Sequence, residues 1–283
     1  MKKFISIVIS SLMAVALFLP TNAVAYKVIK VKNGATITGK VTFAGSQDDA
    51  NQHNKEYTIT KDTDVCGIGK RKVDYVKVNQ DGELSDVVVY LDKKKVKKKY
   101  KPVRKGKAWA KGDKKVTINQ KGCEFLPFFT VMANKGKLHA INSDQVAHNI
   151  HTYALIGKVK KTKINVSQPP KEKPKQTLVK KKVKLSKKSH GMKVECDQHD
   201  FMHSFVFVAK NPYYAVVKKD GTYKIDNVPN GKYKVQTWHG YLKNPTPKFV
   251  TIKKGKIIAV KTGKKGKKEK VKTVDFEYEN KKK

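Results

Sequence analysis

Apolar and polar residues alternate along most of this chain, in short runs bounded by glycine, asparagine, aspartate and proline. The clearest runs are 35–45, 72–78, 86–91, 116–119, 136–141, 192–195, 204–208, 249–252 and 257–260. A period of two residues predicts half-buried strands. Turn sequences such as Asn79-Gln-Asp-Gly82 separate them and are typical of hairpins. No segment sustains the 3.6-residue period of a helix, so the pattern predicts an all-β protein built of sandwiches or barrels.

The amino-terminal segment departs from this pattern. Lys2 and Lys3 precede an apolar run over 4–19, and small residues at 23–25 supply a cleavage site. These features are typical of a secretory signal peptide over residues 1–25. An uncleaved anchor is the alternative, but the run is short for a membrane span. Because no later segment is long and apolar enough to cross a bilayer, we expect an exported protein, periplasmic or extracellular.

The cysteine count is odd, which is informative for an exported chain. Oxidising compartments favour paired cysteines, so one of Cys66, Cys123 and Cys196 needs another explanation. Cys66 and Cys123 have no histidine at metal-binding spacing. The economical assignment is a Cys66–Cys123 disulfide and a metal-bound thiolate at Cys196. An intermolecular bridge through Cys196 is the rival interpretation.

A short loop between two expected strands carries the candidate chemistry. Cys196, His199 and Met202 follow one another at intervals of three residues. A thiolate, an imidazole and a thioether form a set of ligands that suits copper better than a hard cation. A second histidine must come from elsewhere, and His148 and His151 both offer one. His151 shares a face with His148 only if the strand bulges between them, and the Asn-Ser-Asp turn before His148 favours that residue.

Two neighbours of these ligands have expected roles of their own. Asn149 is expected to support the site, with its backbone hydrogen-bonding the cysteine sulfur. His203 is an alternative ligand, although in an extended backbone its side chain would point away from that of Met202, towards solvent. Met202 is interpreted either as an axial ligand or as a buried core methionine. His53, His139, His190 and His239 have no ligand-spaced partner and are interpreted as surface or packing residues.

This arrangement of residues resembles the cupredoxins, the plastocyanin-like blue-copper proteins. The shared features are the order His148, Cys196, His199, Met202, the Cys-Xaa-Xaa-His spacing and a strand after the loop. The gap between His199 and Met202 is shorter than in plastocyanin, so the axial position stays open between the two interpretations of Met202. The resemblance covers roughly 93–210. It implies a Greek-key β-sandwich with one copper ion per chain.

A second resemblance covers the two sides of this segment. Asp220-Gly-Thr-Tyr223 and the 228–235 run look like a carboxypeptidase regulatory-like (transthyretin-like) sandwich, with 38–43 and 87–91 as its first strands. The resemblance implies a cupredoxin domain at 93–209 inserted between sandwich halves at 30–92 and 210–262, with a basic tail at 263–283. Three modules in sequence are the simpler alternative. Exported bacterial proteins of this layout are often called plastocyanin-like or methylamine-utilisation-like.

The charge of the chain is extreme. Lysine and arginine number 63 against 23 aspartate and glutamate, a formal net charge of +40 at pH 7. Such a field attracts anionic partners in a salt-dependent way. An acidic redox protein such as a cytochrome, or an anionic envelope surface, would be attracted by this charge. The alternative is a bias in composition, with the lysines simply solvated. The exported location and the lack of an aromatic-and-basic groove pattern argue against nucleic acid.

Together these features predict an exported one-electron carrier with copper held by His148, Cys196, His199 and Met202. No Ser-His-Asp or paired-carboxylate signature is present, so we do not expect an enzyme. Two rivals stay open. One is a copper storage or delivery protein using the same ligands, and the other is a metal-free basic module that binds the cell envelope.

Overall fold

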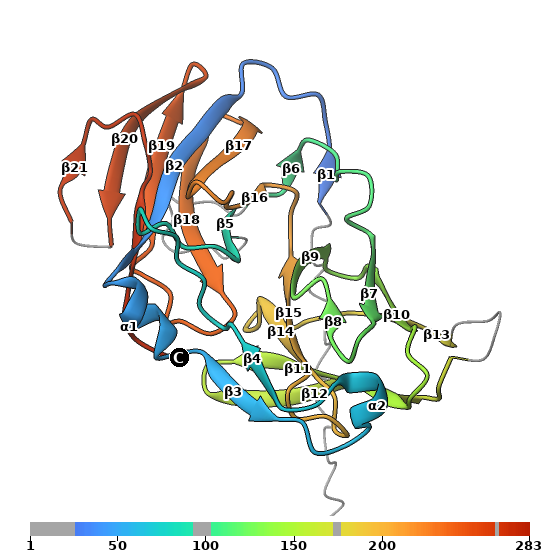
Figure 1. The fold of residues 1–283 in the computed structure, drawn as a ribbon. Helices are drawn as coiled ribbons and strands as arrows, with labels where there is room; N and C mark the ends of the chain where they lie inside the picture. Colours follow the sequence, from blue (N-terminus) through green and yellow to red (C-terminus); the bar gives the residue numbers. More distant parts are fainter. Residues whose placement is uncertain (1–25, 93–102, 172–176, 264–265) are drawn as a thin grey trace, which may run out of the picture.

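The computed structural model describes residues 26–92, 103–171, 177–263 and 266–283. The expected signal peptide at 1–25 and the whole lysine run at 93–101 lie outside these ranges. Within them the chain is almost entirely β, as the alternating pattern predicted (Figure 1). None of the helices in the described ranges is long and apolar enough to cross a membrane.

The first sandwich takes strands from both sides of the expected insert. We call it the outer sandwich. One sheet has the order β16 (Tyr214–Val216), β5 (Val87–Leu91), β18 (Gly231–His239), β19 (Lys248–Lys253), β20 (Lys256–Thr262), β21 (Lys268–Glu269). The other has the order β17 (Thr222–Val228), β2 (Ala35–Ala44), β22 (Phe276–Glu279). The strict alternation of buried and exposed residues along β2 explains its place over the core.

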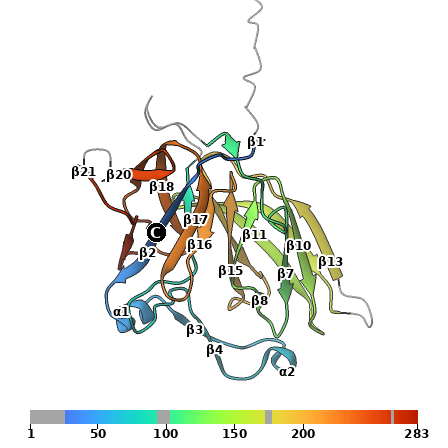
Figure 2. The same cartoon turned by 90° about the horizontal axis from the view of Figure 1, so that it is seen from above.

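The second sandwich consists of strands between β5 and β16, and we call it the inserted sandwich. Its four-stranded sheet has the order β13 (Thr177–Lys182), β10 (Lys137–Asn142), β7 (Lys115–Gln120), β8 (Phe125–Leu126). Its five-stranded sheet has the order β12 (Val159–Gln168), β11 (His148–Ile156), β14 (Gly191–Glu195), β15 (His203–Ala209), β9 (Phe129–Ala133). The short strands β1 (Lys27–Val28) and β6 (Lys105–Gly106) pair with each other. Figures 1 and 2 show the two sandwiches side by side.

Trp238 lies where the two sandwiches meet, rather than inside one of them. Its indole packs against Phe129, Phe205 and Phe207 of the five-stranded sheet, with ring centroids 5.7–6.5 Å apart. Gly191 lies so close to this ring that a Cβ there would clash with it. Buried aromatic pairs of this kind contribute about 0.5–1.5 kcal/mol each beyond the area they remove from water. This contact fixes the inserted sandwich against the outer one.

A segment of the outer half also reaches across the end of the inserted sandwich. It consists of β3 (Lys55–Thr58), α2 (Thr63–Cys66) and β4 (Lys70–Val73) (Figure 1). We call it the β3–β4 arm. The disulfide Cys66–Cys123 joins α2 to the turn between β7 and β8. The short helix α1 (Gln47–Asn51) precedes it and begins with a capping box between Ser46 and Asp49. Neither helix was predicted, because four or five residues are too few to establish a helical period.

The carboxyl-terminal segment corrects one expectation. Residues 263–283 were expected to form a basic tail, yet β22 pairs in parallel with β2 and buries Phe276 and Tyr278. Val274 is fully buried beside them. The alternation of these three apolar residues satisfies the strand pattern. The lysines around them obscured it, although lysine is tolerated wherever the side chain reaches water.

Candidate metal centre

The loop at 196–202 joins β14 and β15, which pair as an antiparallel hairpin with Glu195 opposite His203. Two backbone hydrogen bonds close it: Cys196 N–H donates to Met202 O at 3.4 Å, and Met202 N–H donates to His199 O at 3.1 Å. This closed turn brings the cysteine and histidine side chains together. β11 pairs with β14 on the other side, so His148 at its start lies alongside the loop.

Three donor atoms converge at this point. His148 Nδ1 lies 3.1 Å from His199 Nδ1, and Cys196 Sγ lies 3.7 Å from His199 Nδ1. The donor atoms of all three residues lie within 4.8 Å of one another. Metal–nitrogen bonds of about 2.0–2.1 Å and a metal–sulfur bond of about 2.3 Å, at angles of about 100–120°, separate donors by about 3.1–3.8 Å. The donor set therefore fits one metal ion bound by two nitrogens and a sulfur.

A carboxylate holds the far nitrogen of each imidazole. His148 Nε2 lies 2.9 Å from Asp144 Oδ2, and His199 Nε2 lies 2.9 Å from Asp62 Oδ2. An ionised carboxylate only accepts hydrogen bonds, so each Nε2 carries the proton. In neutral imidazoles both Nδ1 atoms then present lone pairs to each other. At 3.1 Å the two Nδ1 atoms need a shared proton or a metal ion between them, and carboxylate–histidine pairs of this kind are typical of metal sites.

The cysteine is prepared to bind as a thiolate. Burial alone would raise the pKa of Cys196, but the adjacent imidazoles of His148 and His199 and hydrogen bonds from the backbone of Asn149 and Gln198 lower it to about 6. Metals bind the thiolate rather than the thiol. Asn149 thus has the backbone position expected from the sequence. Its side chain adds a second support, because its Oδ1 accepts from Asp197 N–H at 2.6 Å in the ligand loop.

The site is almost completely removed from water. His148, His199 and Cys196 are 0%, 1% and 4% exposed. Met202 is also buried, at 1%, consistent with either interpretation of that residue.

The two alternative ligands lie elsewhere. His151 Nδ1 contacts Asp197 Oδ1 at 2.9 Å and His151 Nε2 contacts Thr162 at 3.0 Å, so His151 is outside the donor cluster. The expectation that His203 faces solvent was wrong: its side chain is 8% exposed, with its ring against those of Tyr57 and Tyr75. The β3–β4 arm and the residues after it cover that face of the hairpin, an arrangement that strand alternation alone does not reveal.

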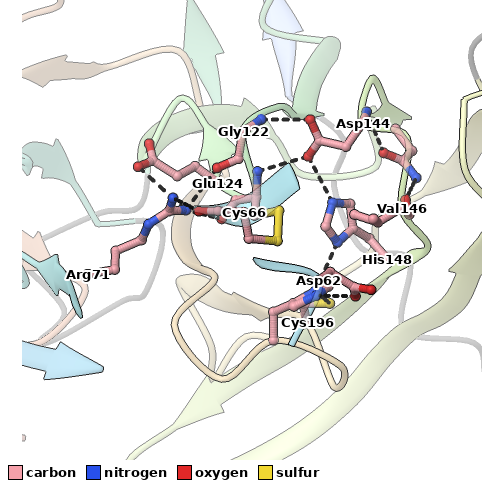
Figure 3. Close-up of a disulfide and its surroundings, with 12 residues drawn as sticks. Asp62, Cys66, Arg71, Gly122, Glu124, Asp144, Val146, His148 and Cys196 are labelled. Atoms are coloured by element: carbon pink, nitrogen blue, oxygen red, sulfur yellow. Dashed lines mark hydrogen bonds and ion pairs between the residues drawn. A yellow bond between two sulfur atoms is a disulfide. The ribbon is translucent and has the colours of Figure 1, made fainter. Parts of the chain in front are cut away.

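A disulfide joins the two segments of the chain that hold the carboxylates of the site. Cys66 and Cys123 are bonded, while Cys196 is a free, buried thiol. Asp144 accepts hydrogen bonds from Gly122 N–H at 2.7 Å and Cys123 N–H at 2.9 Å. On the other side, Cys66 ends the helix α2 that Asp62 precedes. Figure 3 shows this disulfide beside His148 and Asp144. A second metal-compatible group joins Cys123, Asp144 and His148, but a disulfide sulfur is not available as a thiolate.

Sequence reasoning missed Asp62 and Asp144 as parts of the site. Asp144 precedes His148 by four residues in a turn that the sequence analysis used only to choose between histidines. Asp62 is 137 residues from His199, and the one available signal was its position four residues before a cysteine expected to pair with Cys123. Asp62 also has a left-handed backbone, with φ of 52°, which aspartate and asparagine adopt more readily than most residues.

Replacing Asp62 with asparagine should weaken metal binding at this centre by about 10- to 100-fold, the usual effect of losing a partner of a ligand histidine. Asparagine keeps the left-handed backbone accessible but removes the charged acceptor from His199 Nε2. Competition with a chelator of known affinity measures the change. Asp64→Asn is the matched control, because Asp64 is exposed in the helix that Asp62 precedes and its loss changes the net charge equally. Equal weakening in both variants would contradict a specific role for Asp62.

No protein-family model and no curated protein sequence matches the chain. Solved structures do resemble part of it. An amicyanin variant in its reduced Cu(I) form at pH 4 is 18% identical over 35% of this chain and 85% of its own, with a TM-score of 0.25. Amicyanin from Paracoccus versutus is 16% identical over 33% of this chain and 80% of its own, also at 0.25. A copper-containing nitrite reductase from Thermus scotoductus SA-01 is 13% identical over 34% of this chain and 22% of its own, at 0.25. Similarity at this level supports no functional assignment by itself.

Proposed function

We propose that this protein is an exported one-electron carrier with a single copper ion held by His148, Cys196 and His199. The observation that supports it most is the buried convergence of two imidazole nitrogens and one thiol, with each imidazole's other nitrogen fixed by a carboxylate. Two histidines and a cysteine with a weak axial thioether are typical of blue-copper sites. Copper bound there would supply a reversible Cu(II)/Cu(I) couple.

The protein's own contribution is to keep these ligands in place in both oxidation states. The closed loop, the neighbouring strand β11 and the two carboxylates restrain the three side chains from independent elements. A restrained ligand set changes little on electron transfer. Met202 is the last residue of this loop and is buried. We propose it as the axial ligand.

Burial favours a carrier over the two rivals and over an enzyme. A protein that hands its copper to another must let incoming ligands reach the ion, whereas these donor residues are at most 4% exposed. Catalysis requires an accessible coordination position. A metal-free envelope-binding module would have no use for two buried imidazoles and a thiol that converge on one point.

The proposed redox partner is an acidic protein, such as a cytochrome, that docks over the β3–β4 arm. Asp62 bonds to His199 and is 29% exposed in its side chain, so this corner offers a short path between the site and the surface. Exposed Lys61 and Lys70 flank it. An anionic envelope surface is the alternative partner for this charge. The resemblance of the outer sandwich to a regulatory-like domain remains part of the proposal, since that half supplies the arm.

Copper loading and electrochemistry test this function. We expect one copper per chain, an intense thiolate-to-Cu(II) absorption band, and reversible voltammetry in which copper stays bound through repeated cycles. Retention is measured by adding a Cu(I) chelator after reduction. Copper that transfers to the chelator within one reduction would instead support delivery. If the protein binds no copper, the metal-free envelope-binding module is the hypothesis that remains.

A further inference from the structure

Away from the metal centre, a cavity of about 240 Å³ lies between the β3–β4 arm, the inserted sandwich and the end of β18. It is slightly smaller than typical small-molecule sites, which occupy about 300–1,000 Å³. Six of the residues that line it are lysines: Lys55, Lys158, Lys160, Lys193, Lys282 and Lys283. Lysine is common in this chain, and this cavity brings six lysines to one place.

The positive charge of this cavity is poorly balanced. Among the described residues, ion pairs join only Lys160 and Lys193 of the six to a carboxylate, and both use Glu195. Lys193 is 17% exposed in its side chain, and burial lowers its pKa against the opposing effect of Glu195. The Lys283 ammonium instead donates to His239 O and lies 4.7 Å from the Trp238 centroid. An ammonium removed from water without a full counter-charge is costly unless an anion joins it.

The walls of the cavity are aromatic. Tyr75 and Tyr241 stack with their ring centroids 5.0 Å apart, and Phe205 lies within 6.3 Å of Tyr75. Tyr57 completes this wall and shares a hydrogen bond of 2.9 Å between its hydroxyl and that of Tyr75. Rings that are locked by packing and hydrogen bonding offer a rigid apolar surface to a flat ligand. Their negative faces also hold the neighbouring lysines, with Lys282 Nζ 5.0 Å from the Tyr241 centroid.

We propose that this cavity is a binding site for a small organic anion that carries two or more carboxylate or phosphate groups on a flat apolar body. The ammonium groups neutralise the anionic groups, and the aromatic wall contacts the body. The cavity volume of about 240 Å³ limits the ligand to a small molecule. This site is separate from the metal centre and does not depend on the proposed electron transfer.

Calorimetric titration with benzene-1,3-dicarboxylate tests the proposal, on copper-loaded and copper-free full-length protein at about 0.15 M salt. We expect one saturable site per chain in both forms. Lys193→Met and the exposed Lys158→Met should each weaken binding at least tenfold. Lys253→Met is the matched control, because it removes the same charge from the exposed end of β19, and it should change the affinity less than twofold.

Three results would overturn the proposal. Equal weakening by Lys253→Met, or several weak sites per chain, would show only general attraction to a basic surface. Inorganic phosphate binding as tightly as the dicarboxylate, with no effect of Tyr241→Leu, would remove the role of the aromatic wall. Binding of hexaglutamate but not of the dicarboxylate, with the same sensitivity to Lys158→Met, would make the cavity a docking point for an acidic protein.

Discussion

Replacing Cys196 with serine should abolish the visible charge-transfer band and weaken copper binding by a hundredfold to several thousandfold. The band requires a thiolate bound to Cu(II), and serine offers no thiolate. Nitrogen and sulfur metal sites with a full ligand set bind with about 10–16 kcal/mol, so one of three strong donors accounts for about 3–5 kcal/mol. Absorption spectra and chelator competition measure both effects.

Two variants separate this effect from general disturbance. His151→Gln removes a histidine that is near the site but bonded to Asp197 instead of joining the donors, and it should retain both the band and the affinity. Met202→Leu should retain copper while raising or lowering the reduction potential, because the axial bond is weak. If the Cys196→Ser variant kept an unchanged thiolate-to-Cu(II) band, the copper would lie elsewhere and the proposed centre would be wrong.

The ligand loop could be identified from the sequence because its information is local. Cys196, His199 and Met202 are spaced within one turn between two apolar runs, so a single loop determines their proximity. His148 was harder, since it belongs to a different strand. The preceding turn selected it over His151, and the structure places His148 Nδ1, not a nitrogen of His151, against His199.

The supports of the site could not be identified in the same way. Asp62 approaches His199 only because the β3–β4 arm crosses from the outer half of the chain, and no period or motif encodes that crossing. The burial of His203 has the same cause. The strand at Phe276–Glu279 is a different case, because its alternation was present in the sequence. Residues 263–283 were interpreted as a tail because of their high lysine content. That interpretation gave composition more weight than the alternation of apolar and polar residues.

Replacing both Cys66 and Cys123 with alanine should lower the free energy of unfolding by about 4 kcal/mol, as expected for a crosslink between residues 57 apart in sequence. Both are replaced together because a single remaining thiol could be oxidised by air to a disulfide with Cys196. Urea denaturation of copper-free protein measures the loss. Arg71 donates hydrogen bonds to Cys123 O and Cys66 O, each at 2.8 Å, so the two segments should stay near each other in the folded variant.

The same double variant should also bind copper about tenfold more weakly under conditions where it is fully folded. The crosslink holds the turn that donates to Asp144 against the helix that Asp62 precedes, and both carboxylates orient ligand histidines. If this is the reason, adding Asp62→Asn to the double variant should weaken binding less than it does in the parent protein, because the effects share one cause. Fully additive losses, or an unchanged copper affinity, would show that the disulfide stabilises the fold without orienting the ligands.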